Sequence, residues 1–361
     1  MRQSKIAYQV HNKMTGGRNW SAPEQDYFRD HIKRLNPAAL LFLDDEGRAL
    51  EYKAILPDCA VVVRTWTGDE GEFHLKYTPQ EIFNRYKDTP RDLIRNVGNE
   101  PSGYDNLPKL AVWYAEIMDL FGNAGISVAV PGFGEGHPNE NKLSELEPLW
   151  RALDKWHDVH YYNIHEYGTW RGMVYNEPGK WDVYPWRVGR FEALVKPYLI
   201  AAGHKIPRVL VTEFGVDDAH DGTGKRGWRD SMSEQMYADE LKKAIDKIYT
   251  APHYVGLCLF CWGNSGKPGT PEDWHTFDVS EAKTLHSALE QMKPAAPIPT
   301  PPPVPVPAPT PTPAPEPADT VTFTGVDIQA IIDLWKETAA HFEGLAAVAK
   351  RIIQSYERKL N

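Results

Sequence analysis

Two glutamates in this sequence stand near the ends of apolar runs that are typical of buried strands. Glu100 follows the run in Arg95-Asn-Val-Gly-Asn-Glu-Pro101, and Glu213 lies in Val209-Leu-Val-Thr-Glu-Phe-Gly215. A strand that ends in this way presents a carboxylate where the chain emerges at a surface. Two carboxylates held close together can act as a general acid and as its partner base or nucleophile. That chemistry requires elements that bring Glu100 and Glu213 together.

The elements around these glutamates are short apolar runs with helix-like segments between them. The expected strands are 5–10, 38–43, 59–63, 93–97, 126–130, 159–164, 208–212 and 255–260, and the expected helices begin near 21 and 78 and cover about 107–122, 144–156, 186–202, 231–249 and 280–292. Eight strands alternating with helices predict a (β/α)8 barrel. The runs are almost continuously apolar, as parallel strands covered on both faces should be. A doubly wound sheet fits less well, because no glycine-rich phosphate turn follows the first run.

Two helix starts carry capping signals. Ser21 and Glu24 have the spacing of a capping box, and so do Thr78 and Glu81, with Pro79 between them. Asp44 and Asp45, after the second run, are expected to cap the helix that follows.

In such a barrel the carboxyl ends of the strands form one rim, where the active site lies. Besides Glu100 and Glu213, this rim would collect His11, Arg64, Trp66, Asn99, Glu135, His165, Tyr167 and Trp262. Polar groups bind sugar hydroxyls, and aromatic faces stack on the C–H surface of a sugar ring. We therefore expect a carbohydrate ligand at this rim.

Composition excludes several other classes of protein. The chain has 361 residues, 42% of them hydrophobic, and a net charge of -9, which argues against a nucleic-acid partner. Cys59, Cys258 and Cys261 lie in or beside apolar runs and are expected to be buried free thiols. The CxxC spacing of the last two is weak evidence for a metal, so we expect no metal and no cofactor. No stretch has the length of a membrane span.

The composition changes at Pro294. We expect the barrel to occupy residues 1–293 and residues 294–319 to form a Pro/Ala/Thr-rich linker of polyproline type. Residues 320–361 then predict an amphipathic helix with a heptad seam. The seam carries Ile328, Trp335, Phe342, Ala349 and Tyr356 at sevenfold spacing. A lone helix of this kind is expected to pair with its own copies or with a partner helix. Docking back on the barrel is the alternative.

Four strand-end motifs resemble those of clan A glycoside hydrolases, especially family 5. They are Asn99-Glu100-Pro101 on the fourth strand, His165-Glu166-Tyr167 after the sixth, Thr212-Glu213-Phe214-Gly215 on the seventh, and Trp262 after the eighth. Each motif is weak alone, but all four occur in order over about residues 5–292. The resemblance implies a retaining glycosidase that cleaves β-glycosidic bonds in a polysaccharide or oligosaccharide, with Glu213 as nucleophile and Glu100 as acid/base.

The resemblance also implies supporting roles. Asn99 would bind the sugar 2-hydroxyl, His165 would place the acid/base or the sugar, Tyr167 would hold the nucleophile, and Trp262 would form the floor of the cleaved-sugar subsite. Glu135 is a candidate substrate contact, and Glu166 is expected to be structural. One departure is that family 5 members usually carry the active-site arginine on an earlier strand and a histidine on the third, where this chain has Arg64 and Trp66. The role of Arg64 therefore stays open between support of the nucleophile and a buried ion pair.

Two questions stay open from the sequence. The alternative function is a non-catalytic carbohydrate-binding or structural assembly protein on a barrel scaffold. Residues 1–8 lack the apolar segment of a signal peptide, which leaves the localisation unknown. A proline–threonine spacer is common in exported or particle-bound glycosidases, so an extracellular or particle-associated location by a non-classical route is one interpretation.

Overall fold

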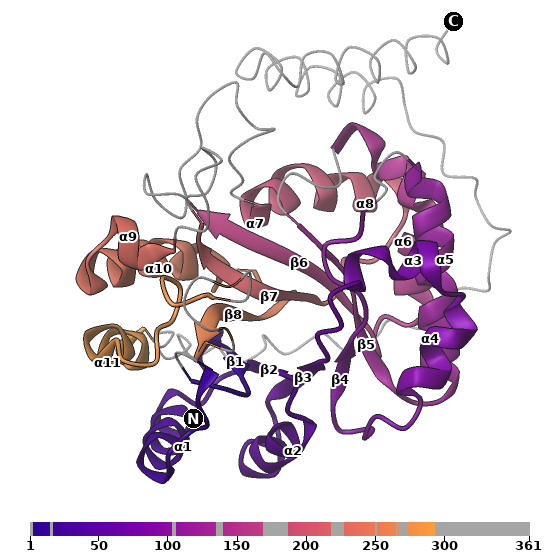
Figure 1. Ribbon diagram of the computed structural model, residues 1–361. Coiled ribbons are helices and arrows are strands. Elements are labelled where there is room, and N and C mark those ends of the chain that lie inside the picture. The colour runs from indigo at the N-terminus through magenta and orange to yellow at the C-terminus, as the bar shows by residue number, and fades with distance from the viewer. Residues whose placement is uncertain are drawn as a thin grey trace, which may run out of the picture. The chain divides into compact units, whose positions relative to one another are not determined.

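The computed structural model describes residues 3–14, 17–102, 106–134, 140–168, 187–217, 227–249, 251–264, 266, 270 and 273–292. Parallel strands β1 to β8 pair in chain order, and β8 closes the barrel on β1. Helices surround the strands, with α1, α10 and α11 on one side and α4 and α5 on another (Figure 1). The predicted (β/α)8 barrel is confirmed.

The strands follow the apolar runs closely. They are β1 (Ile6–His11), β2 (Ala39–Leu43), β3 (Ala60–Arg64), β4 (Ile94–Asn96), β5 (Ser127–Phe133), β6 (Tyr161–Gly168), β7 (Val209–Val216) and β8 (Tyr254–Trp262). The strands β6 and β7 extend beyond the apolar runs that predict them. Three candidate site residues, His165, Tyr167 and Glu213, therefore lie within strands rather than in loops.

Helices connect the strands on the outside. They are α1 (Ala22–Leu35), α2 (Glu46–Ile55), α3 (Phe73–Lys76), α4 (Pro79–Tyr86), α5 (Leu107–Asn123), α6 (Glu147–Lys155), α7 (Arg187–Arg190), α8 (Lys196–Ala202), α9 (Trp228–Ser231), α10 (Glu234–Ile248) and α11 (Lys283–Gln291). The helix expected over 186–202 is divided by a π-helix, η5 (Phe191–Val195). Pro197 lies in the first turn of α8 and has no N–H, so it cannot continue the hydrogen-bond ladder from the residues before it.

Capping residues fix where two of these helices begin. The Glu24 carboxylate accepts the N–H of Ser21, and Glu81 accepts that of Thr78, so both predicted capping boxes form. Of the two aspartates after β2, only Asp45 caps α2, accepting the Arg48 N–H at 2.9 Å. Asp44 has a different partner near the rim.

The core has two layers. An inner layer fills the barrel and includes Leu41, Val62, Ala129, Leu210 and Cys258, and a larger outer layer packs between the strands and the helices. Burial on both faces explains why the strands are apolar at nearly every position. The three cysteines are free and buried, as expected, and burial raises the pKa of the Cys59 thiol to about 12.

Several predictions lie outside the described residues. These are Glu135, the linker over 294–319 and the helix over 320–361. Within the described part of the chain, no helix is both long enough and apolar enough to cross a membrane.

Candidate active site

The strand ends bring the two predicted carboxylates together. Glu213 lies in β7, and Glu100 follows β4 by four residues. One carboxylate oxygen of Glu100 lies within 4.8 Å of one of Glu213, and the imidazole of His165 is within the same distance of both. The register of β6 on β7 places His165 opposite Glu213, which explains how the histidine reaches both groups.

Glu213 is the more enclosed of the two carboxylates. Its side chain is 10% exposed. The guanidinium of Arg64 donates from Nη1 to Oε1 at 2.6 Å, and the Tyr167 hydroxyl donates to Oε2 at 2.6 Å. Charge-assisted hydrogen bonds of this length hold a carboxylate in one orientation.

Tyr167 is suited to remain a donor. It lies in β6 and is buried. Burial raises the pKa of the Tyr167 hydroxyl well above its usual range, and the negative charge of Glu213 raises it further. The phenol therefore keeps its proton beside the carboxylate.

Arg64 is fixed on its other side by a residue that the sequence did not single out. Glu70, in the 3-10 helix η2 (Glu70–Glu72), accepts from Arg64 Nε at 2.9 Å and from Nη2 at 3.2 Å. Burial lowers the pKa of the Arg64 guanidinium, but the carboxylates of Glu70 and Glu213 together raise it above its usual value. Arg64 thus forms a buried ion pair with Glu70 and also contacts the candidate nucleophile, Glu213.

Glu100 has a different environment. Its side chain is 50% exposed, and Oε1 lies 3.0 Å from Nδ1 of the fully buried His165. The same nitrogen is 3.5 Å from Oε2 of Glu213. The backbone of Glu100 has φ 43°, a left-handed conformation that is uncommon outside glycine. The two candidate carboxyl groups therefore differ in exposure, Glu100 being half-exposed and Glu213 enclosed.

Asn99, the residue before Glu100, carries a buried acceptor. Its Oδ1 has no hydrogen-bond partner among the described residues. A buried carbonyl oxygen without a partner is costly, so such an atom indicates a position that a ligand donor can fill.

His11 lies at the end of β1 and is buried. Its ring meets the Phe260 ring edge-on with centroids 5.7 Å apart. Burial and the nearby charge of Arg64 lower the pKa of His11 to about 3. It is therefore a neutral imidazole beside the charged centre.

Trp66 is an exposed indole at the end of β3. It is 48% exposed, and its backbone N–H donates to Oδ1 of Asp44 at 2.7 Å. The aspartate expected to cap α2 therefore holds the Trp66 backbone instead. Exposure of a large ring on a fixed backbone suits stacking on a sugar.

The role expected for Trp262 is wrong. This residue is 2% exposed and packs outside the barrel against Tyr8 of β1, Phe28 and His31 of α1, and His286 of α11. The pairing of β1 with β8 shifts register between Leu259 and Trp262, so a regular alternation does not predict which side chains face the rim.

Phe260, two residues before Trp262 in β8, is the aromatic residue of this strand that lies beside candidate site residues. Its ring meets those of Tyr167 and His11, with centroids 6.3 and 5.7 Å away. Trp274 packs edge-on against Phe260, with ring centroids 5.0 Å apart. Phe260 is only 5% exposed, so it supports the rim from beneath. In the sequence, the only indication of this was that a second aromatic residue, Phe260, lies two positions before Trp262 in the same apolar run.

Glu166 is structural, as expected. It is fully buried in β6, and its Oε2 accepts the N–H of Val188 at 2.7 Å, near the start of α7.

A cluster of Glu100, His165 and Glu213 also has the side-chain types of a metal site. Both oxygens of Glu213 already accept hydrogen bonds from Arg64 and Tyr167, and Nδ1 of His165 contacts Glu100. A cation bound at Glu213 would lie beside the positive guanidinium of Arg64, and the repulsion between like charges disfavours it. The arrangement therefore fits proton transfer better than metal ligation.

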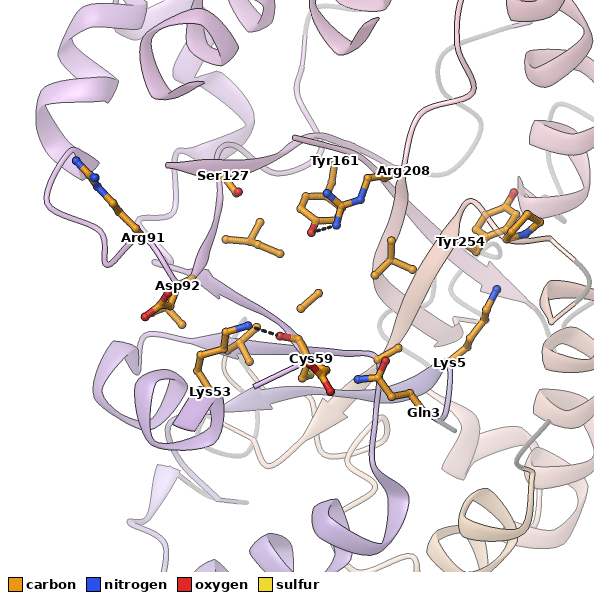
Figure 2. Close-up of a pocket in the computed structure, with 18 of the residues that line it drawn as sticks. Gln3, Lys5, Lys53, Cys59, Arg91, Asp92, Ser127, Tyr161, Arg208 and Tyr254 are labelled. Carbon is orange, nitrogen blue, oxygen red and sulfur yellow. Dashed lines mark hydrogen bonds between the residues drawn. The ribbon is translucent and has the colours of Figure 1, made fainter. Parts of the chain in front are cut away.

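The opposite, amino-terminal end of the barrel holds a hollow of about 740 Å³ (Figure 2). Two lysines that line it donate to backbone carbonyls: Lys5 to those of Ile248 and Ala251, and Lys53 to those of Pro57 and Cys59. Arg208 stacks on Tyr161, 4.0 Å from the ring centroid. These contacts join neighbouring elements at this end of the barrel, whereas the two candidate carboxylates lie at the carboxyl end of the strands.

Comparisons with known proteins find likeness only at the level of the fold. No family model and no curated protein matches the sequence. A β-glucuronidase from Faecalibacterium prausnitzii matches with 14% identity and a TM-score of 0.48, over 80% of this chain and 49% of its own. This chain thus spans about half the length of that protein.

Two further structures match over most of their own length. A GH128 endo-β-1,3-glucanase from Sorangium cellulosum has 13% identity and a TM-score of 0.46, over 81% of this chain and all of its own. A GH5 xyloglucan-specific endo-β-1,4-glucanase from a metagenomic library has 14% identity and a TM-score of 0.44, over 80% and 96%. All three are glycoside hydrolases by name, the class that the strand-end motifs resemble. At these identities and TM-scores the likeness decides no activity, which rests on the side chains of the site.

Proposed function

We propose that this chain is a retaining glycoside hydrolase that cleaves β-glycosidic bonds of an oligosaccharide or polysaccharide by double displacement. The observation that supports it is the pair of carboxylates at facing strand ends, with oxygens within 4.8 Å of each other. Retaining enzymes place their two carboxyl groups about 5–5.5 Å apart, whereas inverting enzymes need about 6.5–9.5 Å to admit a water molecule. The short spacing favours retention.

In the first step Glu213 attacks the anomeric carbon. The bond from that carbon to the leaving oxygen breaks, and Glu100 donates its proton to this oxygen, which leaves a glycosyl ester on Glu213. Arg64 and Tyr167 orient the attacking carboxylate through their hydrogen bonds of 2.6 Å. Held in this way, the nucleophile needs little reorganisation before attack.

In the second step Glu100 removes a proton from water. The water oxygen bonds to the anomeric carbon, the ester bond to Glu213 breaks, and the sugar leaves with its original configuration. The half-exposed position of Glu100 supports this role, because its carboxyl must meet both a leaving group and solvent. His165, between the two carboxylates, supports Glu100 in its position.

The remaining rim residues support recognition of a sugar. The unpartnered Oδ1 of Asn99 can accept a hydrogen bond from the 2-hydroxyl, a contact that strengthens in the transition state. The exposed ring of Trp66, two residues after Arg64 in the chain, offers a surface on which a sugar can stack.

A panel of aryl β-glycosides and β-linked polysaccharides tests the proposal. We expect release of sugar by the wild type, no release by Glu213→Gln, and a first-formed product of unchanged anomeric configuration by NMR. A 2-deoxy-2-fluoro glycoside should add one sugar mass to the intact protein, at Glu213. Inverted product would contradict the mechanism. Binding of a polysaccharide without Glu213-dependent release of sugar would favour the alternative of a non-catalytic carbohydrate-binding protein.

A further inference from the structure

One short segment, between β3 and α3, contacts residues next to both candidate catalytic carboxylates. Within it Glu70 accepts hydrogen bonds from Arg64, which in turn donates to Glu213. The next residue, Gly71, packs against the backbone of Glu100. The two catalytic candidates lie on different strands, β4 and β7, so a single segment that meets both can fix the distance between them.

On the nucleophile side, Glu70 orients Arg64. It accepts two hydrogen bonds from the guanidinium, at 2.9 and 3.2 Å, which leaves Nη1 directed at Glu213. A carboxylate that accepts from two nitrogens of an arginine fixes the plane of the guanidinium as well as its distance. Glu70 is 6% exposed, and a buried carboxylate is stable only when it is paired in this way.

On the acid/base side, Gly71 packs against the chain that carries Glu100. A Cβ added to Gly71 would lie 2.9 Å from the carbonyl oxygen of Glu100 and 3.2 Å from that of Asn99. The Gly71 carbonyl also accepts the N–H of Ser102 at 2.7 Å and its hydroxyl at 3.1 Å. Only a residue without a side chain permits this approach, and it ties the segment to the residues around Glu100.

We propose that Glu70 and Gly71 are positioning residues that set the separation of the two carboxylates, Glu70 through Arg64 and Gly71 through the backbone of Glu100. The proposal rests on the function proposed above. A displacement of about 1 Å at reacting groups can lower a rate about 100-fold. In these roles both residues act through other groups and not on the substrate, so their substitution should lower kcat more than it raises KM.

The two halves of the proposal give different dependences on the leaving group. Glu70→Gln loosens Arg64 and hence the nucleophile, so kcat/KM should fall about 10- to 100-fold for every aryl glycoside, whatever its leaving group. Gly71→Ala displaces the acid/base, so its loss should be large for a poor leaving group. For a dinitrophenolate, which departs without a proton, its loss should be small.

Matched controls separate positioning from general damage. Glu72→Gln changes an exposed glutamate of the same segment, and Gly47→Ala adds a methyl group that meets only an ordinary contact at 3.8 Å. Both should keep wild-type kinetics. Glu70→Asp keeps the charge but shortens the side chain, and it should show a loss intermediate between wild type and Glu70→Gln. This variant also tests the proposal if Glu70→Gln does not fold.

Crystal structures of the variants provide a measurement that does not depend on activity. We expect the carboxyl separation to change in Gly71→Ala, and the Arg64 to Glu213 contact to lengthen in Glu70→Gln. Unchanged geometry in both variants would overturn the positioning roles. An inactive wild type with the altered geometries would overturn the proposed function alone. An active wild type with Glu70→Gln kinetics equal to those of Glu72→Gln would overturn the role of Glu70.

Discussion

Tyr167 and Glu213 lie on adjacent strands of the barrel, and the phenol of Tyr167 donates a hydrogen bond of 2.6 Å to Oε2 of Glu213. With Arg64 on the other oxygen, each half of the carboxylate has its own donor. The burial of Tyr167 keeps its hydroxyl protonated. The position of the candidate nucleophile in β7 is therefore set by side chains from two other strands, β3 and β6.

Removal of the Tyr167 hydroxyl should weaken catalysis without unfolding the protein. A hydrogen bond to a charged group contributes about 1.5–3 kcal/mol, which corresponds to about 10- to 150-fold in rate if the bond is needed in the transition state. We expect Tyr167→Phe to lower kcat/KM on an aryl β-glycoside within that range. Circular dichroism should match wild type. A wild-type rate in this variant would mean that the contact does not serve catalysis.

Substitution of Glu100 should reveal its role as acid. General acid–base catalysis contributes about 100- to 10,000-fold, so Glu100→Gln should lose activity in that range on a substrate with a poor leaving group. The first step with a dinitrophenyl glycoside needs no proton, so a burst of phenol should persist before slow turnover. Stopped-flow absorbance measures this burst. If the burst is absent and the variant loses activity equally for all leaving groups, Glu100 does not act as the acid/base.

The strand order and the pairing of Glu100 with Glu213 could be predicted from the sequence, because both depend on local pattern. Apolar runs fix the strands, and parallel strands place their carboxyl ends at one rim. The partner of Arg64 could not be predicted, because Glu70 lies in a polar turn whose orientation depends on tertiary contacts. Trp262 was misplaced because a register shift in β8 is invisible to a period-two pattern.

Buried histidines should make the protein sensitive to acid. Burial lowers the pKa of His286 to about 3 and that of His160 to about 4, and burial together with Arg64 lowers that of His11 to about 3. Between about pH 6.5, where an unfolded histidine titrates, and pH 4, the unfolded chain binds more protons than the folded chain. The free energy of unfolding therefore falls as the pH falls through this window.

Each such group can contribute up to about 1.4 kcal/mol per pH unit. We expect thermal midpoints measured from pH 7 to pH 4 to fall steeply below pH 6.5. His286→Gln should flatten this slope, and His275→Gln, at an exposed histidine, should not. Equal slopes in the two variants would show that other groups cause the acid sensitivity.

The exposed indole of Trp66 should contribute to binding more than to chemistry. Stacking of an aromatic ring contributes about 0.5–1.5 kcal/mol, so Trp66→Ala should raise KM for a β-linked oligosaccharide about two- to twelvefold. The effect on kcat should be smaller than the effect on KM. Initial rates on an oligosaccharide series measure this split. A fall in kcat at constant KM would place Trp66 in the positioning of the catalytic groups instead.

Trp262 and Phe260 should show opposite behaviour, although they lie two residues apart in β8. Trp262 packs between β1, α1 and α11, so Trp262→Ala should cost about 3–5 kcal/mol of unfolding free energy. Its KM should stay near wild type at a temperature where the variant is folded. Phe260→Leu keeps most of the apolar volume but removes the ring contact with Tyr167, so it should lower kcat/KM with a smaller loss of stability. Urea unfolding and steady-state rates on the same samples measure both. A selective rise of KM in Trp262→Ala at wild-type stability would return Trp262 to the sugar subsite.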